Sequence, residues 1–125
     1  MTDDVIPGDL RDFILRHIDS VAQLEALLLL RANPNEGWDI EQTAARLYVE
    51  QGEVAEVLAR LCADGLLRCT DGRYRFGCDT AEQQAMVDRL AAAYSVHLIP
   101  VTAIIHAKPR RIREFANAFK FRKDR

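Results

Sequence analysis

The sequence has few of the residues on which metal sites and disulfide-rich domains depend. Only three cysteines occur among 125 residues, and no two of them have the CxxC spacing of zinc or thioredoxin-type motifs. The three histidines are widely spaced and form no HExxH pattern. The six glycines form no phosphate-binding loop and no GxSxG nucleophile motif. These absences argue against an enzyme and predict a protein without a metal or cofactor.

Long hydrophobic runs and a cationic start are also missing. No apolar run reaches the roughly 18 residues that cross a bilayer, and the chain begins with Met1, Thr2, Asp3 and Asp4, which do not resemble a signal peptide. We therefore expect a cytoplasmic protein without a membrane span.

In a reducing compartment the cysteines are expected to be inert, buried thiols. The alternative is a redox or metal sensor that uses Cys62 and Cys69, whereas Cys78 lies further along the chain.

The charges are distributed unevenly along the chain, although the net charge is only -2. Residues 1–105 carry 9 Lys/Arg and 17 Asp/Glu, whereas residues 106–125 carry 8 and 2. Attraction to a polyanion should therefore be strongest at the C-terminal tail.

Hydrophobic periodicity predicts several helices before residue 65. Apolar residues recur at helical spacing from residue 10 to residue 18, and helix 21–32 is apolar around much of its circumference. Ser20 and Asp39 each precede a helix by one position and have Gln three residues later, as in a capping box. Residues 48–50 predict a tight turn between a short helix and helix 51–63, which Gly65 terminates.

A β-hairpin is predicted after these helices. Asp71-Gly72 separates two short segments, 66–69 and 73–76, and Asp-Gly is a strong signal for a two-residue hairpin turn. Trp38 is expected to add a short strand.

The order of these elements, with the segments Trp38–Leu47 and Val54–Leu67, resembles MarR-like bacterial winged-helix regulators. The resemblance implies a mainly α fold with a small β-hairpin wing: a winged helix–turn–helix plus a long C-terminal helical arm. We expect residues 1–78 to form the first unit and residues 79–125 the arm, with an unrelated small α+β domain as the alternative. Residues 113–123 also resemble the end of uncharacterised bacterial winged-helix proteins, which supplies no activity.

The arm has a heptad-like apolar seam that Pro100 interrupts, so we expect a kink or break near residues 96–100. The seam and helix 21–32 predict a symmetric homodimer. The expected interface residues are Leu27, Leu30, Val87, Tyr94, Leu98, Val101 and Ile105. The alternative is that the arm folds back on the first helix.

The resemblance implies a dimeric transcriptional regulator, but helix 51–63 is poorly suited to reading DNA. Residues 36–64 contain seven acidic and two basic side chains, which would repel phosphates. DNA binding would therefore rely on the wing and the basic tail. The expected nucleic-acid-binding residues are Gln51, Arg60, Arg68, Arg73, Arg75, Lys108, Arg110, Arg111 and Arg113.

Three alternatives remain open at this point. The protein could be an interaction module whose acidic helix face docks a basic partner. The wing arginines could neutralise the acidic helices beside them. The tail could bind a membrane surface or the protein's own acidic body.

Overall fold

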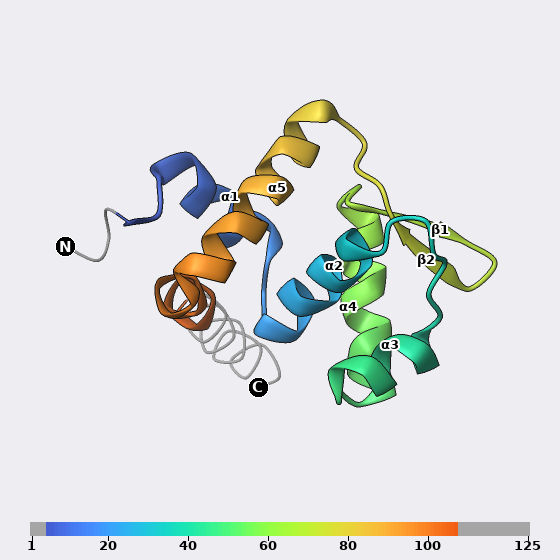
Figure 1. Cartoon of the computed structure of the whole chain (residues 1–125). Coiled ribbons are helices and arrows are strands. Elements are labelled where there is room, and N and C mark those ends of the chain that lie inside the picture. Colours follow the sequence, from blue (N-terminus) through green and yellow to red (C-terminus); the bar gives the residue numbers. More distant parts are fainter. Residues whose placement is uncertain (1–4, 108–125) are drawn as a thin grey trace, which may run out of the picture.

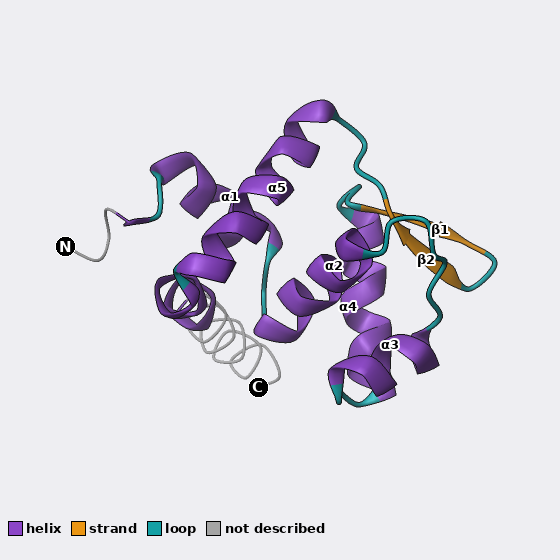
Figure 2. Ribbon diagram, in the orientation of Figure 1, coloured by secondary structure: helices purple, strands orange, loops and turns teal. Residues whose placement is uncertain are grey.

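The computed structural model describes residues 5–107, in which helices surround a single core and a hairpin projects from one side (Figures 1 and 2). The labelled elements are α1 (Gly8–His17), α2 (Val21–Ala32), α3 (Ile40–Leu47), α4 (Gln51–Ala63), β1 (Leu67–Thr70), β2 (Arg73–Phe76) and α5 (Ala81–Val96). A further helix, Leu98–Ala107, follows α5. The prediction of a mainly helical chain with a small β-hairpin is confirmed.

Side-chain caps fix the starts of three helices. Asp39 with Gln42, and Thr80 with Gln83, form complete capping boxes at α3 and α5. Ser20 accepts a hydrogen bond from the backbone N–H of Gln23, as predicted. The Gln23 side chain, however, does not bond to the Ser20 amide as a capping box requires. It accepts from the Asp19 amide and donates to the His17 carbonyl.

Left-handed residues end two helices at the positions that the sequence indicated. Tyr48 (φ 59°) turns the chain between α3 and α4, and Gly65 (φ 80°) follows α4. The amide of Leu66 donates to the Leu61 carbonyl, and the amide of Gly65 donates to the Cys62 carbonyl. These two bonds form a Schellman motif, so the α4–β1 junction is held by the backbone itself.

The hairpin is an antiparallel pair closed by the Asp71-Gly72 turn. Both turn residues have positive φ, 55° and 76°, as a type I′ turn requires. Trp38 adds an isolated bridge to Tyr74, with N···O distances of 2.8 and 2.7 Å. Because Trp38 is itself buried, this bridge attaches β2 to the body of the protein.

The C-terminal helices complete the same hydrophobic core as the rest of the chain. Val87 and Leu90 of α5, and Ile105 of the following helix, are fully buried among residues of α1, α2 and α4. The predicted boundary at residue 78 therefore separates two segments that share one core.

Polar contacts hold α5 against the first two helices. Arg89 pairs with Asp9 of α1 at 2.8 Å, and Arg31 of α2 pairs with Asp88 at 3.0 Å. Tyr94 donates to Glu25 of α2 at 3.1 Å, and burial, followed by the charge of Glu25, raises the pKa of its hydroxyl.

The predicted break in the arm is confirmed. Helix α5 ends at Val96, and the axis turns by 114° into Leu98–Ala107. Pro100 is the third residue of this helix, where its missing N–H breaks no intrahelical hydrogen bond. Within residues 5–107, no single helix has the length and apolar character to cross a membrane, and only the bent pair together meets those criteria.

The predicted dimer seam needs a correction, because most of it faces inward. Five of its residues are fully buried within the single chain, where they cannot contact a second subunit without opening the core. They are Leu27, Leu30, Val87, Val101 and Ile105. Tyr94 is half-buried, and Leu98 has 52% of its surface exposed. The 114° break after α5 turns the second half of the seam in another direction, so the seam is not one continuous stripe. Helix α5 contacts α1, as in the alternative in which the arm folds back on the first helix.

Candidate nucleic-acid interface

The hairpin gathers its arginines on one face. The strand register places Arg68 opposite Arg75 and Thr70 opposite Arg73. Because side chains alternate along a strand, these four residues share one face, which we call the hairpin arginine face. The other face carries Leu67, Cys69, Tyr74 and Phe76. Leu67 belongs to the hydrophobic core, and Tyr74 and Phe76 pack against it.

A pocket of about 380 Å³ lies on the hairpin arginine face. Its lining consists of Gly37, Arg68, Thr70, Asp71, Arg73 and Arg75. Three guanidinium groups and one carboxylate therefore surround it, which gives the pocket a positive balance. Gly37 allows the close approach, since a Cβ there would lie 3.3 Å from the Cδ atom of Arg73.

The three arginines differ in the number of polar groups that already bind their guanidinium groups. Arg68 donates to the Asp79 carboxylate at 2.6 Å and to the Cys78 carbonyl at 2.8 Å. Arg73 donates to the Gly37 carbonyl at 3.1 Å and has no carboxylate partner among residues 5–107. The side chain of Arg75 makes no hydrogen bond or ion pair within the same residues. Two exposed guanidinium groups are therefore available to an anion.

Helix α4, by contrast, presents an acidic surface. Glu50, Glu53 and Glu56 are exposed and form no ion pair with the described part of the chain. Gln51 is exposed in the first turn. Arg60 is paired with Asp19 at 2.7 Å and with Asp64 at 3.4 Å. Arg60 was expected to read bases, but its charge is neutralised by acidic side chains of its own chain.

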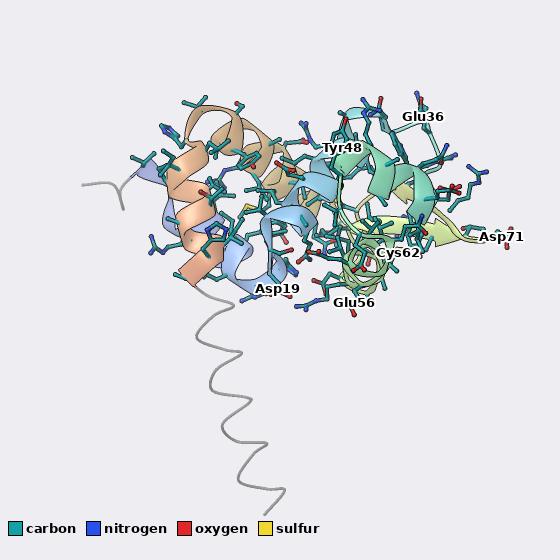
Figure 3. The ribbon with its side chains drawn as sticks, turned by 90° about the horizontal axis from the view of Figure 1, so that it is seen from below. Asp19, Glu36, Tyr48, Glu56, Cys62 and Asp71 are labelled. Atoms are coloured by element: carbon teal, nitrogen blue, oxygen red, sulfur yellow. A yellow bond between two sulfur atoms is a disulfide. The ribbon has the colours of Figure 1, made fainter. Side chains whose placement is uncertain are left out.

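A second hollow, of about 450 Å³, lies between the start of α2 and α4. Its lining consists of Asp19, Ser20, Gln23, Glu53, Glu56, Val57 and Arg60. In Figure 3, Asp19 and Glu56 lie along the same edge of the molecule, whereas Asp71 lies at the distant hairpin tip. The acidic hollow and the hairpin arginine face are therefore separate surfaces.

The cysteines are arranged differently from the prediction. Cys62 and Cys69 form a disulfide, with their Cα atoms 6.4 Å apart, and are not free, inert thiols. The sequence reasoning joined these two residues only in the alternative of a redox or metal sensor, because their spacing does not reveal that the α4–β1 turn reverses the chain and brings residues seven positions apart together. Cys78 is a half-buried free thiol, and burial raises its pKa.

Tyr48 is a surface residue that the sequence reasoning treated only as part of a turn. It is 95% exposed at the junction of α3 and α4. Its immediate neighbours, Leu47 and Val49, are apolar, so the sequence carries no local signal that this aromatic side chain is exposed.

The remaining predicted binding residues, Lys108, Arg110, Arg111 and Arg113, lie outside the described residues. Across residues 5–107, no group of three or more His, Cys, Asp or Glu side chains is arranged to hold a metal ion.

Comparisons with known proteins give no family for the chain. No protein-family model matches it, no curated protein matches it, and no solved structure matches it. The geometry of the two surfaces is therefore the basis for an assignment of function.

Proposed function

We propose that this protein is a non-enzymatic, cytoplasmic winged helix–turn–helix regulator that binds the DNA backbone through its hairpin. The order α2, α3, α4, β1, β2, with Trp38 bridged to the hairpin, supports the winged-helix assignment. The observation that carries the binding proposal is the hairpin arginine face, where Arg73 and Arg75 have no carboxylate partner among residues 5–107 and lie beside a positive pocket.

The proposed binding mode is phosphate contact and not base reading. Guanidinium groups bind phosphate oxygens in a bidentate manner, and such contacts position a protein without reading sequence. The carboxylates of Glu50, Glu53 and Glu56 oppose insertion of α4 into a major groove, because each would approach the phosphates without a compensating cation. We therefore propose low sequence specificity and strong salt dependence.

The homodimer and the tail are part of the same proposal. A second copy would double the number of hairpins that reach one duplex, and the basic residues after position 107 would add phosphate contacts. Exposed apolar side chains at the bend, Val96, Leu98 and Ile99, offer surface for self-association.

The test is binding of the full chain to a fluorescent random-sequence duplex across a salt series. The double variant Arg73→Ala/Arg75→Ala should bind at least about tenfold more weakly at low salt, with a salt slope smaller by about two. The matched control is Arg11→Ala/Arg16→Ala, which removes two arginines of α1 whose side chains make no hydrogen bond or ion pair within residues 5–107. Equal weakening by both pairs would mean a general charge effect, and no binding by the wild type would end the proposal.

A second function, docking of a basic protein segment on the acidic hollow, is favoured by Glu50, Glu53 and Glu56, which form no ion pair with the part of the chain that the structure describes. Glu53 and Glu56 line the hollow, so Glu53→Gln/Glu56→Gln should abolish such docking. The same variant should strengthen duplex binding, since it removes two of the negative charges that repel a polyanion. The two functions therefore predict opposite responses to one variant.

A further inference from the structure

The disulfide between Cys62 and Cys69 connects the last turn of α4 to the middle of β1. We propose that these cysteines form a reversible thiol–disulfide couple, which locks the hairpin onto α4 when it is oxidised. This lock should also order the hairpin arginine face and so favour DNA binding, a consequence that rests on the proposed function.

Solvent can reach this couple. Cys69 is exposed, and Cys62 is half-buried at the edge of the core. Exposed disulfides exchange readily with small thiols, whereas buried structural disulfides resist them. In a reducing compartment, which the sequence predicts for this chain, a disulfide is usually transient and serves sensing or catalysis.

The surrounding fold does not depend on the covalent link. The Schellman bonds of Gly65 and Leu66 close the same turn with backbone hydrogen bonds. Leu61 and Leu66 are fully buried on either side of this turn, and the Trp38–Tyr74 bridge anchors β2 separately. The protein can therefore lose the disulfide while the core stays folded, as a switch requires.

The position of Cys69 couples the link to the arginines. In the strand register, the Cys69–Tyr74 pair lies between the Arg68–Arg75 and Thr70–Arg73 pairs. The disulfide is on the opposite side of the hairpin from the guanidinium groups, because side chains alternate. Oxidation thus fixes the centre of the hairpin without covering the pocket.

Cys78 is not part of the couple. Burial raises the pKa of its thiol, which keeps it protonated and poorly nucleophilic. It serves as the control cysteine, since Cys78→Ser leaves both members of the pair in place.

The exchange step needs one disulfide oxidant, such as oxidised glutathione. The thiolate of exposed Cys69 attacks one sulfur of the oxidant, forms a mixed disulfide and releases one glutathione thiolate. The Cys62 thiolate then attacks the Cys69 sulfur and releases the second glutathione. Two electrons pass from the cysteine pair to the oxidant, and the two protons left by the cysteines end on the released thiols or in solvent.

The first experiment titrates the full chain in glutathione buffers from fully reduced to fully oxidised, with free thiols counted by maleimide labelling. The wild type and Cys78→Ser should each lose two reactive thiols in one transition within this range, and Cys69→Ser should show no such transition. A disulfide that stays intact in every buffer, or never forms, overturns the proposal.

The second experiment measures amide hydrogen exchange of both redox forms in the absence of DNA. Residues 67–76 should exchange at least about fivefold faster after reduction, while α1 and α5 stay unchanged. Equal exchange in the hairpin would overturn the lock. Duplex binding then separates this inference from the proposed function: the oxidised form should bind at least about threefold more tightly, and absence of binding by both forms counts against the proposed function alone.

Discussion

Arg68 and Arg75 lie directly opposite each other on the two strands of the hairpin, so two guanidinium groups face each other on one surface. Like charges in this arrangement destabilise a hairpin. Asp79 relieves the repulsion by pairing with Arg68 at 2.6 Å, whereas Arg75 has no ion-pair partner in the described part of the chain. One carboxylate therefore controls how many arginines of this face are available to an anion.

Releasing Arg68 should strengthen duplex binding. In Asp79→Asn the carboxylate is lost and Arg68 can turn to a phosphate, so the salt slope should increase by about one and the affinity at low salt should rise several-fold. Fluorescence anisotropy with the random-sequence duplex measures both quantities. Asp88→Asn, which breaks the Arg31 pair on another surface, is the control for the loss of one negative charge. Equal gains for the two variants would argue against a role for Arg68.

The α4–β1 junction should not tolerate a side chain at Gly65. A Cβ there would overlap the Asp79 side chain, and the positive φ disfavours every residue with a Cβ. Gly65→Ala should therefore lower the free energy of unfolding by about 2 kcal/mol, measured by urea denaturation. Gly52→Ala is the matched control: it lies in α4, where a Cβ would make an ordinary contact 3.8 Å from Oε1 of Glu50, and should stabilise by about 0.5 kcal/mol. An unchanged midpoint for Gly65→Ala would contradict the described turn.

Buried Gln23 should contribute more stability than an ordinary capping residue. Its side-chain oxygen accepts from the Asp19 amide and its nitrogen donates to the His17 carbonyl, each at 2.8 Å. Gln23→Ala leaves both backbone groups without these partners and should cost about 2 kcal/mol of unfolding free energy. Gln42→Ala removes an exposed capping-box residue and should cost less, about 0.5–1 kcal/mol. Similar losses in the two variants would show that the burial of Gln23 carries no extra energy.

The contact between α1 and α5 should depend on acid pH in a defined direction. The Arg89 guanidinium, which donates to both oxygens of Asp9, lowers the pKa of that carboxyl to about 2. Because the folded pKa lies below the ordinary value of 3.8, the pair stabilises the fold above that value. The contribution is lost as the pH falls toward 2.

Carbon-detected NMR titration of Asp9 measures this pKa directly. Arg89→Gln should return the midpoint to the ordinary range, with no change at the distant carboxylate of Asp71. A wild-type midpoint near 3.8 would mean that the ion pair does not persist in solution.

Local signals in the sequence predicted much of the fold, since they act over a few residues. The capping residues Ser20 and Asp39, the Asp71-Gly72 turn and Gly65 occupy the predicted positions for reasons of backbone conformation. Pro100 likewise indicated the break before the last described helix.

Features that depend on the direction of packing were not predictable in this way. A heptad-like seam reports an apolar stripe but not what covers it, so the inward-facing Val87 and Ile105 were assigned to a subunit contact. The Cys62–Cys69 pair depends on how the chain reverses after α4, and the Arg60 pairs depend on the approach of α2 to α4. That Arg73 and Arg75 share one face follows from strand alternation, whereas the addition of Arg68 to that face depends on the strand register.

The shared core has a consequence for the synthesis of this protein. Leu10 near the start and Ile105 near the end of the described chain are both fully enclosed by the same cluster. On the ribosome, α1 emerges long before residue 105 has been added, so its apolar side lacks its final covering during most of translation. Such long-range closure is slow, and it exposes a nascent hydrophobic surface that general chaperones bind. The growing chain should therefore complete its core only when nearly all of residues 5–107 have left the exit tunnel.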